Sequence, residues 1–156
     1  MTLKIINENI TTVTSGVIAH GCNCQGKFAS GVAGAIRAKW PAAYVKFMST
    51  PKNQRVLGNV SIAPIIPDVL WVFNCFTQEF YGRDGKLYAS LGAIKKSLEM
   101  AFLFARFGDY PNMDRTIHMP KIGCGLGGLN WDEVEPIVLT LKKDYDLKVN
   151  IYEIEG

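Results

Sequence analysis

The stretch that decides the fold is Val17-Ile-Ala-His-Gly-Cys-Asn-Cys-Gln-Gly-Lys-Phe-Ala-Ser-Gly-Val-Ala-Gly-Ala-Ile-Arg-Ala-Lys-Trp40. Its first three residues form an apolar run that suits a buried strand, and its last part carries apolar Val32, Ile36 and Trp40 at helical spacing. Between the two lies a loop that contains three glycines. A strand that leads through such a loop into a helix places free backbone N–H groups beside the positive end of the helix dipole. The stretch therefore predicts a site for an anion, and above all for phosphate.

A second glycine loop follows an apolar strand that we expect at residues 116–122. The loop reads Gly123-Cys-Gly-Leu-Gly-Gly128, and Asn130 is a suitable cap for a helix over residues 131–144. The spacing Gly-x-Gly-x-x-Gly matches the dinucleotide fingerprint. A Rossmann fold, however, carries this fingerprint in its first βαβ unit, with an acidic residue about 20 positions further on. Here the motif falls in the last unit of the sequence, so we interpret the loop as a second phosphate-binding turn.

The first glycine loop comes close to a different motif. Residues 21–27 read Gly-x4-Gly-Lys, which is one residue short of a P-loop. The next residue, Phe28, has no hydroxyl group to ligate magnesium, and no acidic residue ends a neighbouring strand as a metal ligand would. The sequence therefore does not favour an NTPase.

Strands and helices alternate along the rest of the chain. Expected strands lie at residues 3–7, 17–22, 59–66, 70–74, 116–122 and 148–154, and expected helices at 30–39, 42–48, 90–107 and 131–144. The Pro67-Asp68 pair predicts a hairpin between the third and fourth strands, and Gly108 is a plausible end for the third helix. Residues 75–86 are expected to form a long polar and aromatic loop. This order predicts one α/β domain over residues 1–156, with helices on both faces of a sheet.

Composition and charge exclude several classes of protein. Hydrophobic residues make up 48% of the 156 residues and charged residues 20%, so the chain is neither disordered nor fibrous. The longest apolar stretches, at residues 70–73 and 101–105, are too short to cross a bilayer, and the N-terminus lacks the apolar segment of a signal peptide. The net charge is only +3 and lysine and arginine are scattered, which argues against nucleic-acid binding. We expect a cytoplasmic monomer.

The four cysteines raise the question of a metal. His20, Cys22 and Cys24 would share one face of a strand, but Cys-x-Cys does not match the Cys-x2-Cys spacing of structural zinc sites. We therefore expect buried, reduced thiols at Cys22, Cys24, Cys75 and Cys124, with no metal and no cofactor.

Both glycine loops follow the carboxyl ends of strands, where open α/β sheets bind their ligands. The sequence therefore predicts one crevice between the loops. Aromatic residues expected in loops at the same end, Phe28, Phe76, Phe80 and Tyr81, are candidates to stack on a base or ribose. Asn23 and Gln25 are candidates to hold sugar hydroxyls, and capping of the loop is the alternative role for both.

These motifs resemble those of a macro domain, the ADP-ribose-binding module. His20-Gly-Cys-Asn-Cys-Gln is similar to the family's strand and first loop, and Ser30-Gly-Val-Ala-Gly-Ala-Ile to its helix start. Pro120-Lys-Ile-Gly-Cys-Gly-Leu-Gly-Gly-Leu-Asn-Trp is similar to its second phosphate loop. The resemblance covers nearly the whole chain and points to the small stand-alone branch, which contains ADP-ribose 1″-phosphate phosphatases, terminal ADP-ribose glycohydrolase and phage-borne members. It implies a three-layer α/β/α fold with a mixed, mostly parallel central sheet.

The resemblance also implies roles for particular residues. Catalytic roles fall on Asn23, which would position a water or the ribose, on Lys86, and on His20, whose place inside a strand favours a core histidine. The glycohydrolase pairs its lysine with an aspartate, whose place is held here by Gly127, and Gly16 stands where an adenine-binding aspartate would be sought. Ligand contacts are expected from Cys22, Gln25, Phe28, Ser30, Gly31, Val32, Ala33, Thr77, Tyr81, Ile122, Gly123, Cys124, Gly125, Leu126 and Gly127.

The activity implied first is hydrolysis of ADP-ribose 1″-phosphate to ADP-ribose. Two alternatives remain open, because all three functions use the same cradle for the diphosphate. One is a reader module that binds ADP-ribose without turnover, and the other is hydrolysis of O-acetyl-ADP-ribose or of ADP-ribose attached to a protein.

Overall fold

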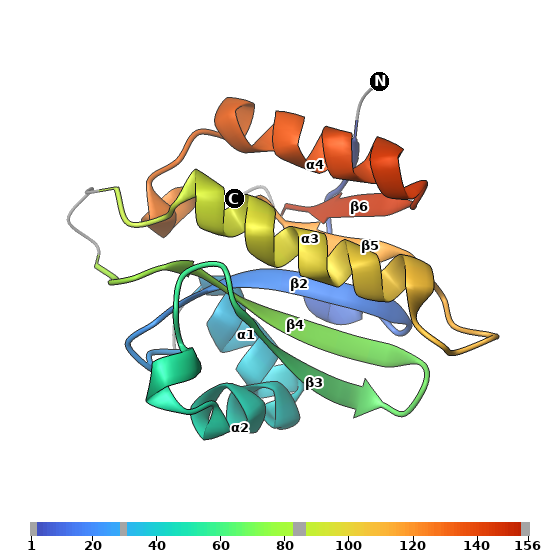
Figure 1. The fold of residues 1–156 in the computed structure, drawn as a ribbon, viewed down its shortest axis with the longest axis horizontal. Helices are drawn as coiled ribbons and strands as arrows, with labels where there is room; N and C mark the ends of the chain where they lie inside the picture. Colours follow the sequence, from blue (N-terminus) through green and yellow to red (C-terminus); the bar gives the residue numbers. More distant parts are fainter. Residues whose placement is uncertain (1–2, 29–30, 83–86, 154–156) are drawn as a thin grey trace.

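The computed structural model describes residues 3–28, 31–82 and 87–153. Of Leu126 it describes the backbone but not the side chain. Within these residues the chain forms a sheet and four α-helices (Figure 1). The strands are β1 (Lys4–Ile6), β2 (Gly16–Asn23), β3 (Val60–Ile66), β4 (Leu70–Gln78), β5 (Ile117–Pro120) and β6 (Val149–Tyr152). The helices are α1 (Gly31–Lys39), α2 (Pro41–Ser49), α3 (Leu91–Phe107) and α4 (Trp131–Tyr145), with short 3-10 turns at Ile10–Thr12, Lys52–Gln54 and Gly125–Gly127.

The six strands form one mixed sheet in the order β1-β6-β5-β2-β4-β3. All neighbouring strands run parallel except β3 and β4, which form the predicted antiparallel hairpin. The central strand β2 pairs with β4 on one side and β5 on the other, so that Ile18 lies between Val72 and His118. The carboxyl ends of these three parallel strands therefore meet at one edge of the sheet.

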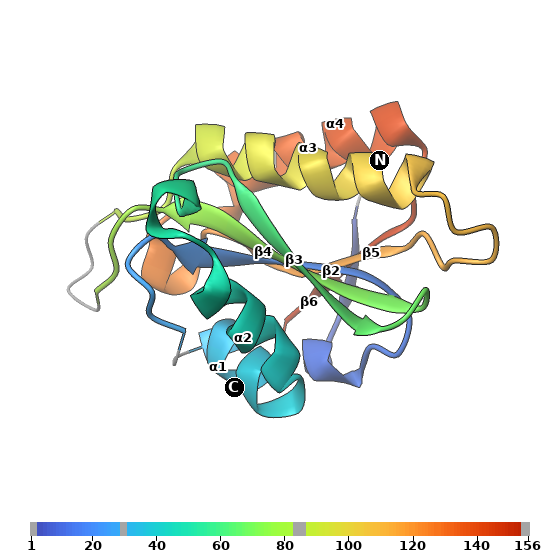
Figure 2. The ribbon, with the colours of Figure 1, turned by 60° about the horizontal axis from the view of Figure 1, so that its bottom comes forward.

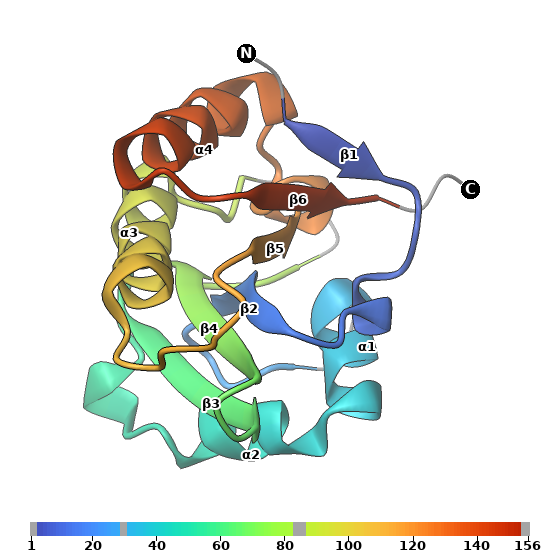
Figure 3. The ribbon, with the colours of Figure 1, turned by 90° about the vertical axis from the view of Figure 1, so that its right-hand side faces the viewer.

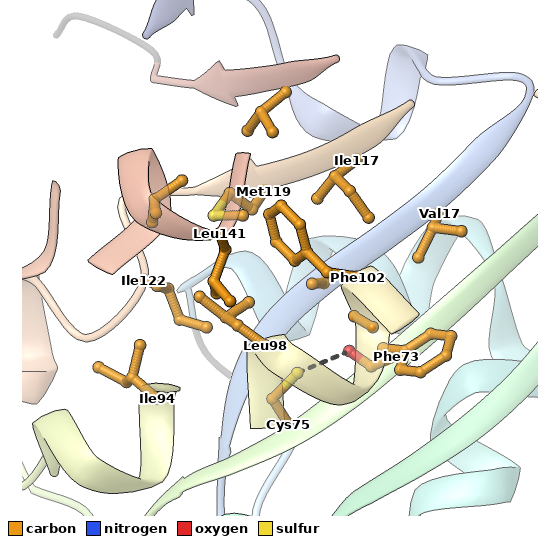
Figure 4. Packing of buried hydrophobic residues seen from close by; sticks show 14 of the residues in the cluster. Val17, Phe73, Cys75, Ile94, Leu98, Phe102, Ile117, Met119, Ile122 and Leu141 are labelled. Atoms are coloured by element: carbon orange, nitrogen blue, oxygen red, sulfur yellow. Dashed lines mark hydrogen bonds between the residues drawn. The ribbon is translucent and has the colours of Figure 1, made fainter. Parts of the chain in front are cut away.

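The helices cover both faces of the sheet, as the order of elements predicts. Figure 2 shows α3 and α4 on one side of the strands and α1 and α2 on the other, and Figure 3 shows the same layers from the edge. Figure 4 shows the larger core, in which Leu98 and Phe102 of α3 face Ile117 and Met119 of β5. No helix in the described part of the chain is long and apolar enough to cross a membrane.

Local sequence signals account for the ends of the longer helices. The hydroxyl oxygen of Ser90 accepts a hydrogen bond from the Ala93 N–H at 3.2 Å, which caps α3, and Gly108 ends the same helix as predicted. At the start of α4, the carboxylate of Glu133 accepts a hydrogen bond from the Asn130 N–H at 2.9 Å. These caps fix where α3 and α4 begin, next to the edge where the strands end.

One boundary differs from the sequence-based expectation. We expected residues 75–86 to form a loop, but β4 continues through Cys75 and Phe76 to Gln78. Cys75 pairs with Gly21 on one side and Val60 on the other, so this segment is hydrogen-bonded along both edges and buried. Thr77 and Gln78 are polar, so the sequence did not indicate a strand there. Their conformation is determined by their position at the end of the sheet and not by their polarity.

Candidate functional site

A cavity of about 560 Å³ lies where the carboxyl ends of β2, β4 and β5 meet the first turn of α1. Its size is typical of small-molecule sites, and its position is where open α/β sheets bind ligands. The structure brings together most of the residues that the sequence singled out. Those that line the cavity are Cys22, Asn23, Gly31, Val32, Ala33, Thr77, Tyr81, Ile122, Gly123, Cys124, Gly125 and Gly127.

Other predicted residues lie elsewhere. Phe28 was expected in the crevice, but its side chain is only 2% exposed and packs against Tyr44 and Phe47 beneath the loop. Gln25 does not line the cavity, because its amide donates to the backbone carbonyl of Glu79 at 3.2 Å. His20 is fully buried within β2 and does not line the cavity.

Two predicted residues, Ser30 and Lys86, lie outside the described residues, and the side chain of Leu126 is not described. Of the other aromatic candidates, Phe76 is buried within β4, whereas Tyr81 is 48% exposed at the rim of the cavity. Tyr81 is therefore the aromatic side chain from this group that is placed to cover a bound ligand.

The first loop is shaped by the side chain of Asn23. The Oδ1 atom of Asn23 accepts hydrogen bonds from the N–H groups of Gln25 at 3.0 Å and Lys27 at 3.2 Å. Its Nδ2 atom donates to the carbonyl of Lys27 at 2.9 Å. One buried amide therefore folds residues 23–27 into a tight turn and fixes the position of Lys27 at the cavity wall.

The second loop presents backbone to the cavity. Gly123 and Gly125 have left-handed φ angles of 79° and 64°, a region that favours glycine. A β-carbon on Gly125 would meet no atom within 4 Å, so this residue faces open space. The backbone N–H groups of both glycines have no acceptor among the described residues. The first turn of α1 also lines the cavity, and its first N–H groups have no partner within the helix, so two sets of backbone donors lie at this site.

Charges around the cavity are positive. Lys27 and Lys121 line it, and the lining contains no aspartate, glutamate or histidine among the described residues. The Nζ atom of Lys121 lies 2.7 Å from the carboxylate of Glu153, which offsets its charge. Lys27 has no ion pair with any described residue. The site therefore suits an anion.

The thiols at the cavity are poorly suited to nucleophilic attack. Burial raises the pKa of Cys22 well above its ordinary value, and burial also raises the pKa of Cys124 against the lowering effect of Lys121. Both groups therefore remain protonated at neutral pH. Among the described residues, no three histidine, cysteine, aspartate or glutamate side chains are grouped to hold a metal ion.

His20 occupies a polar network inside the core. Its Nε2 atom donates to Asn74 Oδ1 at 2.6 Å, and the Asn74 amide in turn donates to Ser61 Oγ and to the Ala43 carbonyl. Burial lowers the pKa of His20 from 6.5 to about 4, although the hydrogen bond to Asn74 acts in the opposite direction. His20 is thus a neutral core histidine, which corrects its assignment as a catalytic group.

We expect His20 to make the fold acid-sensitive. Because its pKa is lower in the folded state, the unfolded state binds the proton more readily between about pH 6.5 and 4, and stability falls as pH falls through this window. The loss between pH 7 and 5 should be about 2 kcal/mol from this residue. Chemical unfolding of wild type and His20→Gln at both pH values measures the difference. An equal loss in both proteins would contradict the assignment of His20 as a neutral core histidine. The stability of the variant should still fall somewhat with pH, because burial also lowers the pKa of His118.

Six described residues that line the cavity were not predicted from the sequence. Lys27 was considered only as the lysine of an incomplete P-loop, although its place between Asn23 and the helix start was a usable signal. Gly21 lies in β2 and approaches Thr77 closely, because a β-carbon there would lie 2.6 Å from the Thr77 hydroxyl. The others are Gln78, Gly82, Pro120 and Lys121, which flank the predicted residues in the sequence.

Several solved structures with this architecture are macrodomains. A macrodomain protein from Streptomyces coelicolor matches with a TM-score of 0.77 and 23% identity, covering 99% of this chain and 100% of that chain. A Trypanosoma brucei macrodomain in complex with ADP-ribose matches with a TM-score of 0.66 and 13% identity, covering 95% of this chain and 62% of that one. A Bacteroides thetaiotaomicron protein of unknown function matches at 0.84 with 27% identity over 99% of each chain. The chain therefore has the macrodomain fold.

Sequence relatives point to one branch of that fold. The chain is 26% identical over 161 residues to an ADP-ribose 1″-phosphate phosphatase of Debaryomyces hansenii, covering 89% of this chain and 88% of the relative. It is 29% identical over 144 residues to an uncharacterized 17.5 kDa protein of Enterobacteria phage T4, covering 87% and 86%. No protein-family model matches the sequence. The sequence is thus similar to the small branch that its motifs indicate.

Proposed function

We propose that this chain binds ADP-ribose in the cavity and hydrolyses ADP-ribose 1″-phosphate to ADP-ribose. The observation that carries the proposal is the pair of donor-rich backbone segments that line one cavity, at the first turn of α1 and at Gly123–Gly125. A diphosphate in this cavity would accept hydrogen bonds from both segments. The similarity to phosphatases of this specificity supports the same substrate.

In the proposed reaction, water attacks the terminal phosphorus and the bond from phosphorus to the ribose oxygen breaks. The proton of the attacking water ends on the released ribose hydroxyl or in solvent. Catalysis of this step depends mainly on positioning and on stabilising charge that develops on the phosphoryl oxygens. Lys27 would supply that stabilisation, and the turn held by Asn23 would position the ribose end of the substrate.

A reader module without turnover is the second candidate, and one observation favours it. No described residue that lines the cavity carries a carboxylate or an imidazole that could accept a proton. Gly127 also leaves little room for the aspartate that the glycohydrolase-like branch would place there. A β-carbon on Gly127 would lie 3.1 Å from the Ala89 β-carbon, and the Gly127 carbonyl accepts hydrogen bonds from the N–H groups of Tyr88 and Ala89.

Binding specificity tests the shared part of both candidates. Calorimetry should give an affinity for ADP-ribose at least about tenfold above that for ATP or AMP, because contacts to the second ribose add to those of the diphosphate. AMP lacks the diphosphate and ATP lacks the second ribose, so the two nucleotides report the two contributions separately. Equal affinity for ATP and ADP-ribose would contradict the proposal.

Turnover separates the two candidates. Incubation with ADP-ribose 1″-phosphate should release inorganic phosphate and ADP-ribose in equal amounts, and O-acetyl-ADP-ribose in a parallel reaction reports the esterase alternative. Binding of ADP-ribose without any phosphate release would favour the reader module. Release of ADP-ribose from modified protein would instead indicate that a residue outside the described ranges replaces the missing aspartate.

A further inference from the structure

Among the described side chains that line the cavity, Lys27 is the cationic one that has no carboxylate partner among the described residues. The other cationic side chain, Lys121, is paired with Glu153 at 2.7 Å. Lys27 is exposed, so its ammonium group can turn toward a bound anion. The point from which this side chain extends is fixed, because the backbone of Lys27 is bound at both its N–H and its carbonyl by the Asn23 amide.

Lys27 lies near the place where we expect the second ribose of the proposed ligand. In the proposed complex, backbone donors at the start of α1 and at Gly123–Gly125 would bind the diphosphate. Lys27 lies in the turn that follows β2, beside Asn23, where we place the second ribose. A group attached to that ribose would meet the Lys27 side chain and not the glycine loops.

We propose that Lys27 is the residue that distinguishes a terminal phosphate monoester from an unmodified ribose, and that Asn23 acts as its positioning residue. The inference rests on the proposed function, because it assumes that ADP-ribose lies in this cavity. A monoester carries close to two negative charges at neutral pH, and a lysine ammonium binds phosphate as a point charge. Lys27 would therefore contribute to binding of ADP-ribose 1″-phosphate and little to binding of ADP-ribose.

The test compares the two ligands in matched variants. In Lys27→Ala, we expect KM for ADP-ribose 1″-phosphate to rise about tenfold, while the inhibition constant of the product ADP-ribose changes less than about twofold. Lys27→Arg keeps the charge and should keep the preference for the monoester. Lys39→Ala is the matched control, because Lys39 is an exposed lysine at the opposite end of α1.

A pH series adds a readout that a purely structural role would not change. The second pKa of a phosphate monoester is about 6, so the preference of wild type for the monoester should decrease below that pH and be nearly constant in Lys27→Ala. An equal loss of affinity for both ligands in Lys27→Ala would place Lys27 on the diphosphate and overturn the inference. No change for either ligand would overturn it as well.

Failure of the inference can be distinguished from failure of the proposed function. If wild type binds ADP-ribose but does not turn over its 1″-phosphate, calorimetry with both ligands gives the same comparison of affinities. If wild type binds neither ligand, the proposed function itself is wrong.

Discussion

Gly125→Val is expected to lower the affinity for ADP-ribose at least about 100-fold, which corresponds to the loss of one or two hydrogen bonds to a charged phosphate. Gly125 has a φ of 64°, which a β-branched residue adopts only with strain. Its missing β-carbon would point into open space, so the valine side chain would occupy room that the ligand needs. Calorimetry with ADP-ribose measures the loss.

A matched glycine separates obstruction from strain. Gly58 also has a left-handed φ, of 88°, but it lies in the turn before β3 and does not line the cavity. A β-carbon there would meet the Lys96 side chain at 2.6 Å, so Gly58→Val should destabilise the fold at least as much as Gly125→Val. We expect both variants to melt cooperatively and only Gly125→Val to lose binding. Equal loss of binding in the two would show that Gly125 serves only as a turn.

Hydrophobic and turn patterns predicted most of the fold. The apolar face of α3, Gly108 after it, and the predicted cap at Asn130 gave helix boundaries within a residue or so. The end of β4 was missed, because Thr77 and Gln78 are polar and their conformation depends on pairing with β2 and Ala89, residues distant in the sequence. Such pairing is a property of the assembled sheet and leaves no local pattern.

The candidate site was predicted in outline and less well in detail. Glycine loops after strands were sufficient to place the crevice, because parallel strands end at a common edge. Phe28 was assigned to the crevice because sequence places it in the loop, but the turn held by Asn23 leads it into the core beside Phe47. The direction of a loop side chain depends on contacts such as these, which spacing alone does not specify.

Asn23 itself shows how a residue can be identified while its contacts are not. The sequence indicated an amide at the end of β2 and left two roles open, contact with the ribose and capping of the loop. In the structure, the Oδ1 atom of Asn23 accepts two hydrogen bonds and its Nδ2 atom donates one, all within residues 23–27. Asn23 also lines the cavity, so its remaining Nδ2 hydrogen can face a ligand.

Asn23→Ala is expected to lower kcat/KM for ADP-ribose 1″-phosphate about 100-fold, in the range seen when one preorganised donor is removed from an active site. The variant loses three hydrogen bonds that shape the first loop, so the loop can no longer hold Lys27 at the cavity wall. Steady-state phosphate release measures the effect. Asn59→Ala is the matched control, since the Asn59 amide holds a loop away from the cavity through a hydrogen bond to Gln54 at 2.8 Å.

A double-mutant cycle determines how Asn23 acts. If Asn23 works partly by placing Lys27, the two substitutions remove one shared contribution, and the double variant should lose clearly less activity than the product of the two single losses. Independent roles would instead give multiplicative losses, because each residue would then stabilise a different part of the substrate. Full activity in Asn23→Ala would contradict both roles and would mean that residues 23–27 keep their shape without the amide.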